Sequence, residues 1–304
     1  RPVQPARVVR GAARQGGRGR CRNGGGGRDG GGQKCVRGWA AGVLEPLGAT
    51  GLTAINFGPG LPRAPVCPGL SVASVGDLET YGLFPAVQDE ELRMFTLESF
   101  SRMYGGAAGR DPVMQMLGQT GQDALQGADI LRTAPVMYSS SVEYGPDTLA
   151  QNVKSISQVF HANIGAKVLY TQHGPFDTHS GELPTHAKLW NEVAGSVGCL
   201  MDDLKEHGTA DDATILIFSE FGRRIKDNAS GIDHGAAGVA FLIGGAVNGG
   251  LYGEYPFLAE AEQIEGYLST NNDFRSAYTL SLTHLCPARR TPTCRTRCQA
   301  NTSK

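Results

Sequence analysis

The sequence predicts an α/β fold in which helices flank a parallel sheet. From residue 147 onward, short apolar runs alternate with amphipathic helical patterns, an order typical of parallel strands joined by helices. In addition, a chain of 304 residues with 40% hydrophobic content is long enough to bury a substantial core. We therefore expect one α/β domain over residues 38–285, flanked by two segments of unlike composition, 1–37 and 286–304.

The first predicted elements lie in the N-terminal half of this domain. Leu52–Phe57 is a short apolar run that ends in a Gly/Pro turn, which indicates a buried strand. Residues 90–104 place apolar side chains at helical spacing. Asp111 followed by Pro112 is a good N-cap with proline at the first helical position. A second helix should therefore begin there and run towards Leu117.

The second half carries the regular alternation. Residues 148–161 and 184–207 are predicted as amphipathic helices, and Gly208 is the expected C-terminal stop of the second one. Its inward face should consist of Leu189, Val193, Val197, Leu200 and Leu204. Strands are predicted at residues 167–172, 214–219 and 239–243.

Both terminal segments have too few apolar side chains to offset the entropy of ordering, so we expect disorder over residues 1–37 and 286–304. Residues 10–32 are rich in Arg and Gly, which would also suit an RNA-binding tail. The lack of interleaved aromatic residues favours a degraded or out-of-frame stretch instead. The first methionine is Met94, which suggests a fragment whose export signal, if any, lay upstream.

Charge and cysteine content exclude several classes of function. The net charge is −1, but residues 39–285 hold 13 basic against 28 acidic residues because the ends are basic. Such an acidic body argues against a nucleic-acid-binding face and suits a cation site. The sequence contains no run of eighteen or more apolar residues, so no membrane span is predicted. Seven cysteines without a CxxC pair give neither a disulfide framework nor a zinc ribbon.

The first motif with chemical content is HGPFDTHSG, directly after the predicted strand at 167–172. Asp177 and His179 are separated by one residue, so they could offer an oxygen and a nitrogen to one cation or to two neighbouring ones. The alternative is a capping interaction before the following helix. In open parallel sheets, ligands bind at the carboxyl ends of strands, where this motif is expected to lie.

Two further motifs follow the later strands. In SEFGRR, Glu220 appears where the chain leaves an apolar strand, a position that is costly for a carboxylate unless it is paired or binds a cation. An ion pair with Arg223 or Arg224 is the alternative. In GIDHG, Asp233 and His234 are predicted to lie in a loop whose glycines allow unusual backbone angles.

We expect the three motifs to converge on one site, because this explains their similar residue types and positions better than three unrelated structural roles. Carboxylates and imidazoles together suit a two-metal hydrolytic centre, in which cations hold the attacking and leaving oxygens. Arg223 and Arg224 would then recognise phosphate or sulfate oxygens through their guanidinium forks, although one of the two is expected to be a solvated charge. His173 and His186 could support the ligands or make ordinary polar contacts.

The ordered motifs VLYTQHGPFDTHSG, SEFGRRIKDNASGIDHG and IGGAVNGGLYGEYP resemble the bacterial domain-of-unknown-function family 1501, a member of the alkaline phosphatase and sulfatase superfamily. The resemblance implies an alkaline-phosphatase-like, mixed, mainly parallel sheet flanked by helices. It also implies hydrolysis of a small phosphate or sulfate ester, divalent ions such as Zn, Mn, Mg or Ca, and twin-arginine export to the periplasm. The metal ligands that it implies are Asp177, His179, Glu220, Asp233 and His234.

The chain departs from the family at both ends. The family's opening strand is not found before Gly38, so the sheet is expected to be incomplete at the N-terminus, and the superfamily's Ser, Thr or Cys nucleophile has no assignable counterpart. We therefore expect metal-site residues in place but a catalytically incompetent chain. The rival hypothesis is a non-catalytic binding or scaffold protein that retains the fold.

Two glycine motifs carry no function in this interpretation. AGSVG at 194–198 resembles a nucleophile elbow but falls inside a predicted helix. GGAVNGG at 244–250 lacks the Lys-Ser/Thr of a phosphate-binding loop, so a hairpin or tight loop is expected. His161 and His207 are interpreted as helix-end residues that the helix dipole favours.

Overall fold

The computed structural model describes residues 52–66, 72–81, 89–107, 111–264 and 266–269. The predictions for segments 1–37 and 286–304 concern residues outside these ranges.

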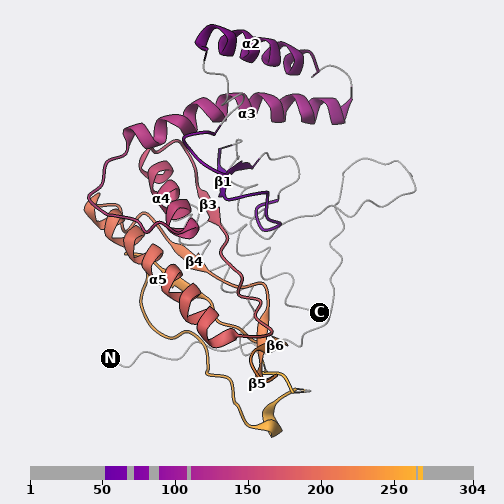
Figure 1. Ribbon diagram of the computed structural model, residues 1–304, viewed down its shortest axis with the longest axis vertical. Coiled ribbons are helices and arrows are strands. Elements are labelled where there is room, and N and C mark those ends of the chain that lie inside the picture. The colour runs from indigo at the N-terminus through magenta and orange to yellow at the C-terminus, as the bar shows by residue number, and fades with distance from the viewer. Residues whose placement is uncertain (1–51, 67–71, 82–88, 108–110, 265, 270–304) are drawn as a thin grey trace, which may run out of the picture. The chain divides into compact units, whose positions relative to one another are not determined.

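A three-stranded parallel sheet lies at the centre of the described region (Figure 1). Its strands are β1 (Ala54–Phe57), β2 (Ala73–Val75) and β3 (Val168–Thr171), in the order β2-β1-β3. Ile55 pairs with Ala73 on one side and with Leu169 on the other. All four residues of β1 are buried, as expected for a central parallel strand with an apolar sequence. The strands predicted at 52–57 and 167–172 are confirmed.

Two helices follow the predicted periodicity closely. α4 (Thr148–His161) begins at Asp147, whose carboxylate accepts a hydrogen bond from the Ala150 N–H at 3.0 Å. α4 contacts β1, β3 and α5 (Glu182–Glu206). The apolar faces of α4 and α5 form a shared core of Leu149, Val153, Val193, Leu200 and Leu204, with Val197 packed against it. AGSVG lies inside α5, as the pattern predicted.

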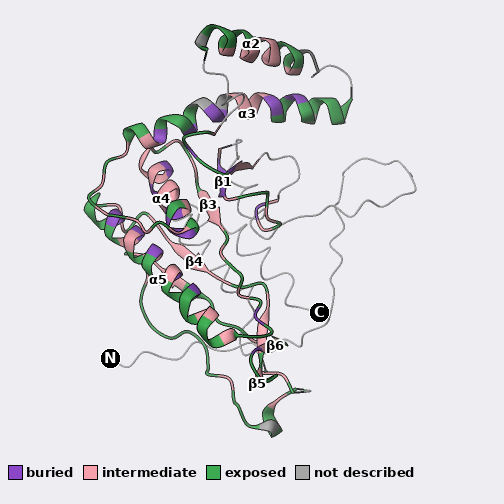
Figure 2. Ribbon diagram, in the orientation of Figure 1, coloured by how far each residue is buried: buried purple, intermediate pink, exposed green. Residues whose placement is uncertain are grey.

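Two long helices precede this part of the chain. α2 (Glu90–Ala107) packs against α3 (Pro112–Met137), and Asp111 caps α3 by accepting from the Val113 N–H at 2.8 Å. α3 extends well beyond Leu117 despite its glycines. Gly121 has a packing reason, because a Cβ there would collide with the Tyr104 ring of α2. Figure 2 shows no buried stretch on α2, so its described side chains are exposed or half-buried.

The later strands pair differently from the prediction. β4 (Ile215–Ile217) and β7 (Phe241–Ile243) form an antiparallel pair. A parallel connection needs a crossover, usually a helix, and the chain between β4 and β7 forms a hairpin instead. That hairpin pairs β5 (Gly222–Asp227) with β6 (Ile232–Gly235). The prediction of a loop at GIDHG was therefore wrong, because these residues complete a strand pair.

The described part of the chain is thus an α/β protein with a small parallel sheet and two antiparallel strand pairs. Residues 244–250 form a turn after β7, with the Val247 N–H on the Gly244 carbonyl at 3.2 Å, as the tight-loop prediction required. A short 3-10 turn, Glu260–Glu262, follows. Within the described residues, no helix combines the length and apolar character that a membrane span requires, in agreement with the sequence.

Candidate metal centre

Three of the predicted ligands come together on the surface. His234 Nε2 lies 2.7 Å from Asp177 Oδ1, and His179 Nε2 lies 3.0 Å from the same oxygen. One ligand atom from each residue falls within 4.8 Å of the other two. The three side chains are each about half exposed, at 55%, 50% and 46% for Asp177, His179 and His234. This arrangement leaves them open to an ion from solvent.

Two segments that lie far apart in the sequence hold this cluster. Asp177 and His179 follow β3, whereas His234 lies on β6 and faces Arg223 of β5 in the strand register. Gly231 lets the segments meet, because a Cβ there would collide with the His179 backbone. Neither Gly231 nor Gly235 adopts a left-handed backbone. The glycines therefore serve close approach rather than the unusual backbone angles that the sequence suggested.

Asp233 lies beside the cluster rather than within it. Its Oδ1 is 3.1 Å from His179 Nδ1 and accepts a hydrogen bond from Asn228 Nδ2 at 3.1 Å. His179 therefore spans two carboxylates, with Nε2 towards Asp177 and Nδ1 towards Asp233. A carboxylate on the far nitrogen is the usual partner that orients a metal-binding imidazole.

Glu220 is placed apart from these residues. It is exposed in the turn between β4 and β5 and does not belong to the group of converging ligand atoms. The next residue, Phe221, stacks on His234 with ring centroids 4.3 Å apart. The sequence analysis did not predict a role for Phe221. The available signal was its position inside SEFGRR, directly after Glu220.

The two arginines make contacts within the protein. Arg223 donates through Nη1 to the Ile232 carbonyl and through Nη2 to the Phe176 carbonyl at 2.6 Å. It thereby ties β6 to the segment that carries Asp177. Arg224 donates to the Tyr267 hydroxyl at 2.7 Å and lies over its ring. Their substrate-binding role stays a prediction, and the contacts give Arg223 a structural role in addition.

The two histidines predicted as possible supports have defined partners. Thr178 lies between the predicted ligands Asp177 and His179 in the sequence. Its Oγ1 is 2.9 Å from His186 Nε2. His173 Nε2 lies 2.9 Å from Glu192 Oε2, and both side chains are mostly buried. His186 thus contacts the ligand-bearing loop directly, and His173 lies at its start.

The electrostatics of the cluster favour an ionised carboxylate. The hydrogen bond with His234 holds the pKa of Asp177 below its ordinary value; desolvation opposes this shift, and the charges of His234, His179 and Arg223 reinforce it. Asp177 is therefore an anion over the whole physiological range, the state that a cation requires.

A second aspartate with two histidines was missed by sequence reasoning. Asp203, His161 and His207 also bring ligand atoms within 4.8 Å of one another, but Asp203 is completely buried. Its Oδ2 accepts hydrogen bonds from the hydroxyls of Tyr138, Tyr144 and Ser157 at 2.5, 2.7 and 2.5 Å. The available signal was an acid on the apolar face of the helix predicted at 184–207.

The fold and the cluster together define a class, an α/β protein that presents an exposed Asp-His-His group beside its sheet. The family profile described as a protein of unknown function, DUF1501, matches residues 108–282. The chain belongs to this family. No curated protein and no solved structure matches it.

Proposed function

We propose that this protein is a metal-dependent hydrolase of the alkaline phosphatase and sulfatase type, acting on a small phosphate or sulfate ester. The observation that carries the proposal is the meeting of two imidazole nitrogens at one carboxylate oxygen, Asp177 Oδ1. Such a mixed nitrogen and oxygen set suits divalent ions such as Zn or Mn, while Mg and Ca prefer oxygen alone. The three side chains are open to solvent, and an ion bound there would replace the hydrogen bonds that join them.

A divalent ion bound there would polarise an ester oxygen and lower the pKa of a water molecule. The residues of the chain would position this chemistry. Asp177, His179 and His234 would be the ligands. Asp233 would orient the His179 ring through Nδ1, and we assign it this positioning role rather than direct ligation. Phe221 would hold the His234 ring by stacking.

Glu220, which the sequence predicted as a metal ligand, does not belong to the Asp177, His179 and His234 group. It is exposed in the turn one residue before Phe221, whose ring stacks on His234. We propose it as a ligand to a second ion or to a bound water. Glu220→Gln should then lower metal stoichiometry or affinity while leaving folding intact.

A second candidate is a non-catalytic metal-binding protein. The hydroxyl that lies between two proposed ligands, Thr178, is buried, and its Oγ1 contacts His186 and accepts a hydrogen bond from Arg223. That contact leaves Thr178 poorly suited to attack an ester. In-line attack is sensitive to misplacement of about 1 Å, so the proposal includes low or no turnover by this chain.

Calorimetric titration with Zn²⁺ and Mn²⁺ tests the metal site. Asp177→Asn and His234→Ala should each weaken binding at least about tenfold, as loss of one of three ligands implies. Asp202→Asn, an exposed aspartate on α5, is the matched control. Unchanged affinity in both cluster variants would overturn the proposal. Chelator-sensitive turnover of 4-nitrophenyl phosphate or sulfate would decide between the hydrolase and the non-catalytic candidate.

A further inference from the structure

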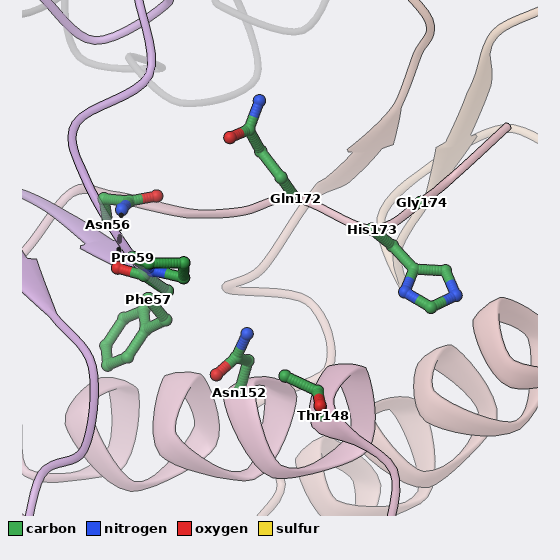
Figure 3. A pocket seen from close by; sticks show the side chains of 9 residues that line it. Asn56, Phe57, Pro59, Thr148, Asn152, Gln172, His173 and Gly174 are labelled. Carbon is green, nitrogen blue, oxygen red and sulfur yellow. Dashed lines mark hydrogen bonds between the residues drawn. The ribbon is translucent and has the colours of Figure 1, made fainter. Parts of the chain in front are cut away.

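A cavity of about 340 Å³ opens at the carboxyl end of the parallel sheet (Figure 3). Its walls come from the end of β1, the segment after β3 and the first turns of α4. In open α/β sheets, this edge is where ligands bind. The volume lies at the small end of the range of ligand pockets, about 300–1,000 Å³. It suits a ligand with a single ring.

The wall of the cavity combines apolar surface with uncharged polar side chains. Among the described residues that line it are Thr148, Asn152, Gln172 and His173, and none of its lining residues is Asp, Glu, Lys or Arg. His173 Nε2 already lies 2.9 Å from Glu192 Oε2. A charged ligand would therefore lose its hydration without gaining a counter-charge. Amides and hydroxyls offer donors and acceptors side by side, which matches a group that carries several hydroxyls.

The polar wall is held in place before any ligand arrives. Asn152 Nδ2 donates to Thr171 Oγ1 at 3.2 Å, and Thr171 Oγ1 donates to the Phe57 carbonyl at 2.9 Å. In Figure 3 the Asn152 side chain rises from α4 towards the space below Gln172. On the opposite wall, Asn56 Nδ2 donates to the Gly60 carbonyl at 2.8 Å and so fixes the turn after β1. A fixed wall lowers the entropy cost of binding.

The cavity lies close to the metal cluster along the chain. Gly174 lines it, and Asp177 follows three residues later, so their Cα atoms are at most about 10 Å apart. We propose that the cavity binds the uncharged, polyhydroxylated part of the substrate, a sugar ring, while its phosphate or sulfate group lies at Asp177, His179 and His234. This assignment of substrate class rests on the function proposed above.

The test separates the cavity from the metal site by using a neutral probe. Saturation-transfer NMR on the metal-free full chain would measure binding of methyl glucoside, methyl galactoside and methyl xyloside. Gln172→Leu and Asn152→Leu each remove hydrogen-bonding groups worth about 0.5–1.5 kcal/mol. At least one glycoside should bind, and its dissociation constant should rise about threefold to tenfold in each variant. Gln119→Leu, an exposed glutamine on α3, is the matched control, and thermal melting would confirm that Gln172→Leu is folded.

The outcomes distinguish the two proposals. Glycoside binding that is equal in the wild type and in Asp177→Asn, but weaker in Gln172→Leu and Asn152→Leu, would support the cavity assignment. Absence of binding by all three glycosides, or binding indifferent to both cavity variants, would overturn it. Glycoside binding together with no Zn²⁺ binding would support a sugar site and overturn the metal-dependent function alone. With Zn²⁺ present, glucose 6-phosphate should bind more tightly than phenyl phosphate, and the preference should disappear in Gln172→Leu.

Discussion

Among the residues that the structure describes, two groups of one aspartate and two histidines differ in almost everything except composition. Asp177, His179 and His234 are half-exposed and meet from two separate segments. Asp203, His161 and His207 come from α4 and the end of α5, with Asp203 completely buried. We call them the exposed cluster and the buried cluster. Proximity of ligand atoms alone does not tell them apart.

The hydrogen bonds of the buried cluster show why it is structural. His161 Nδ1 lies 2.9 Å from the Ser157 carbonyl and Nε2 lies 3.2 Å from Thr209 Oγ1. His207 Nδ1 and Nε2 lie 2.9 and 3.0 Å from the carbonyls of Asp203 and Ser139. All four imidazole nitrogens therefore already have partners within the protein, and a metal ion would have to displace them.

The imidazoles of the exposed cluster are not held by backbone carbonyls in this way. Its short contacts run mainly among its own members and to Asp233. An incoming cation can replace these surface contacts without breaking the core. The comparison teaches that a full account of hydrogen bonds separates a ligand set from a structural network.

The largest effect is expected at the buried carboxylate. Asp203→Ala leaves the buried hydroxyl of Ser157 and the half-buried hydroxyls of Tyr138 and Tyr144 without their acceptor, and breaking such a charged network typically costs about 3–5 kcal/mol. Urea unfolding should show this loss of stability. Asp202→Ala removes a neighbouring exposed aspartate paired with Lys205, and its effect should stay below about 1 kcal/mol. Equal losses in the two variants would contradict the structural role of the buried cluster.

The loss of stability caused by Asp203→Ala should depend on pH. Burial alone would raise the pKa of Asp203, but hydrogen bonds from Ser157, Tyr138 and Tyr144 outweigh it and hold the pKa below its ordinary value. Because the folded pKa is depressed, the stabilisation is fully present above the unfolded value of about 3.9 and is lost as pH falls through the folded pKa. The difference between wild type and Asp203→Ala should therefore narrow below about pH 4. A difference that widened on acidification would reverse this assignment.

The next effect concerns the exposed cluster and a metal ion. Zn²⁺ at about 100 times its dissociation constant should stabilise the wild type by about 2.7 kcal/mol. Asp177→Asn should lose this gain under the same conditions. Thermal melting with and without Zn²⁺ measures both. If His207→Gln abolished the gain and Asp177→Asn did not, the roles of the two clusters would be exchanged.

A smaller effect is expected from one hydroxyl of the buried network. Tyr144→Phe removes the donor at 2.7 Å from Asp203, and a hydrogen bond to a charged group contributes about 1.5–3 kcal/mol. Since Asp203 keeps the hydroxyls of Tyr138 and Ser157, we expect a loss near the lower limit. In a double-mutant cycle with Asp203→Ala, the Tyr144→Phe loss should largely disappear. Full additivity would mean that the two side chains do not interact.

The sequence predicted the elements better than their pairing. Helical periodicity located α4 and α5, and the cap at Asp111 located the start of α3. The pairing of β4 with β7 depends on contacts between residues far apart, which no local pattern encodes. The hairpin of β5 and β6 joins residues close in the sequence, but the glycines of GIDHG favoured a loop prediction there. Asp177, His179 and His234 were predicted as site residues because acidic and histidine side chains next to predicted strands are easy to recognise in a sequence.

The buried cluster shows the limit of that reasoning. His161 and His207 were interpreted as helix-end residues, and Asp203 was not singled out. Only tertiary packing brings Tyr138 and Tyr144 onto Asp203, across 65 and 59 residues of chain. Burial also raises the pKa of Tyr138 to about 12, with the Asp203 hydrogen bond acting in the same direction. Its hydroxyl thus stays a donor at all ordinary pH values.

The smallest effect is expected at the exposed cluster without metal. Asp177→Asn replaces a carboxylate that is about half exposed, at 55%, and that faces two half-exposed histidines. Exposed ion pairs contribute roughly 0–1 kcal/mol because water and salt screen them. In the presence of a chelator, the free energy of unfolding at pH 7 should therefore change by less than about 0.5 kcal/mol. Urea unfolding of the chelator-treated protein measures this change, with Asp202→Asn as the exposed control. A loss of several kcal/mol would place Asp177 in the same structural category as Asp203, and the distinction between the two clusters would fail.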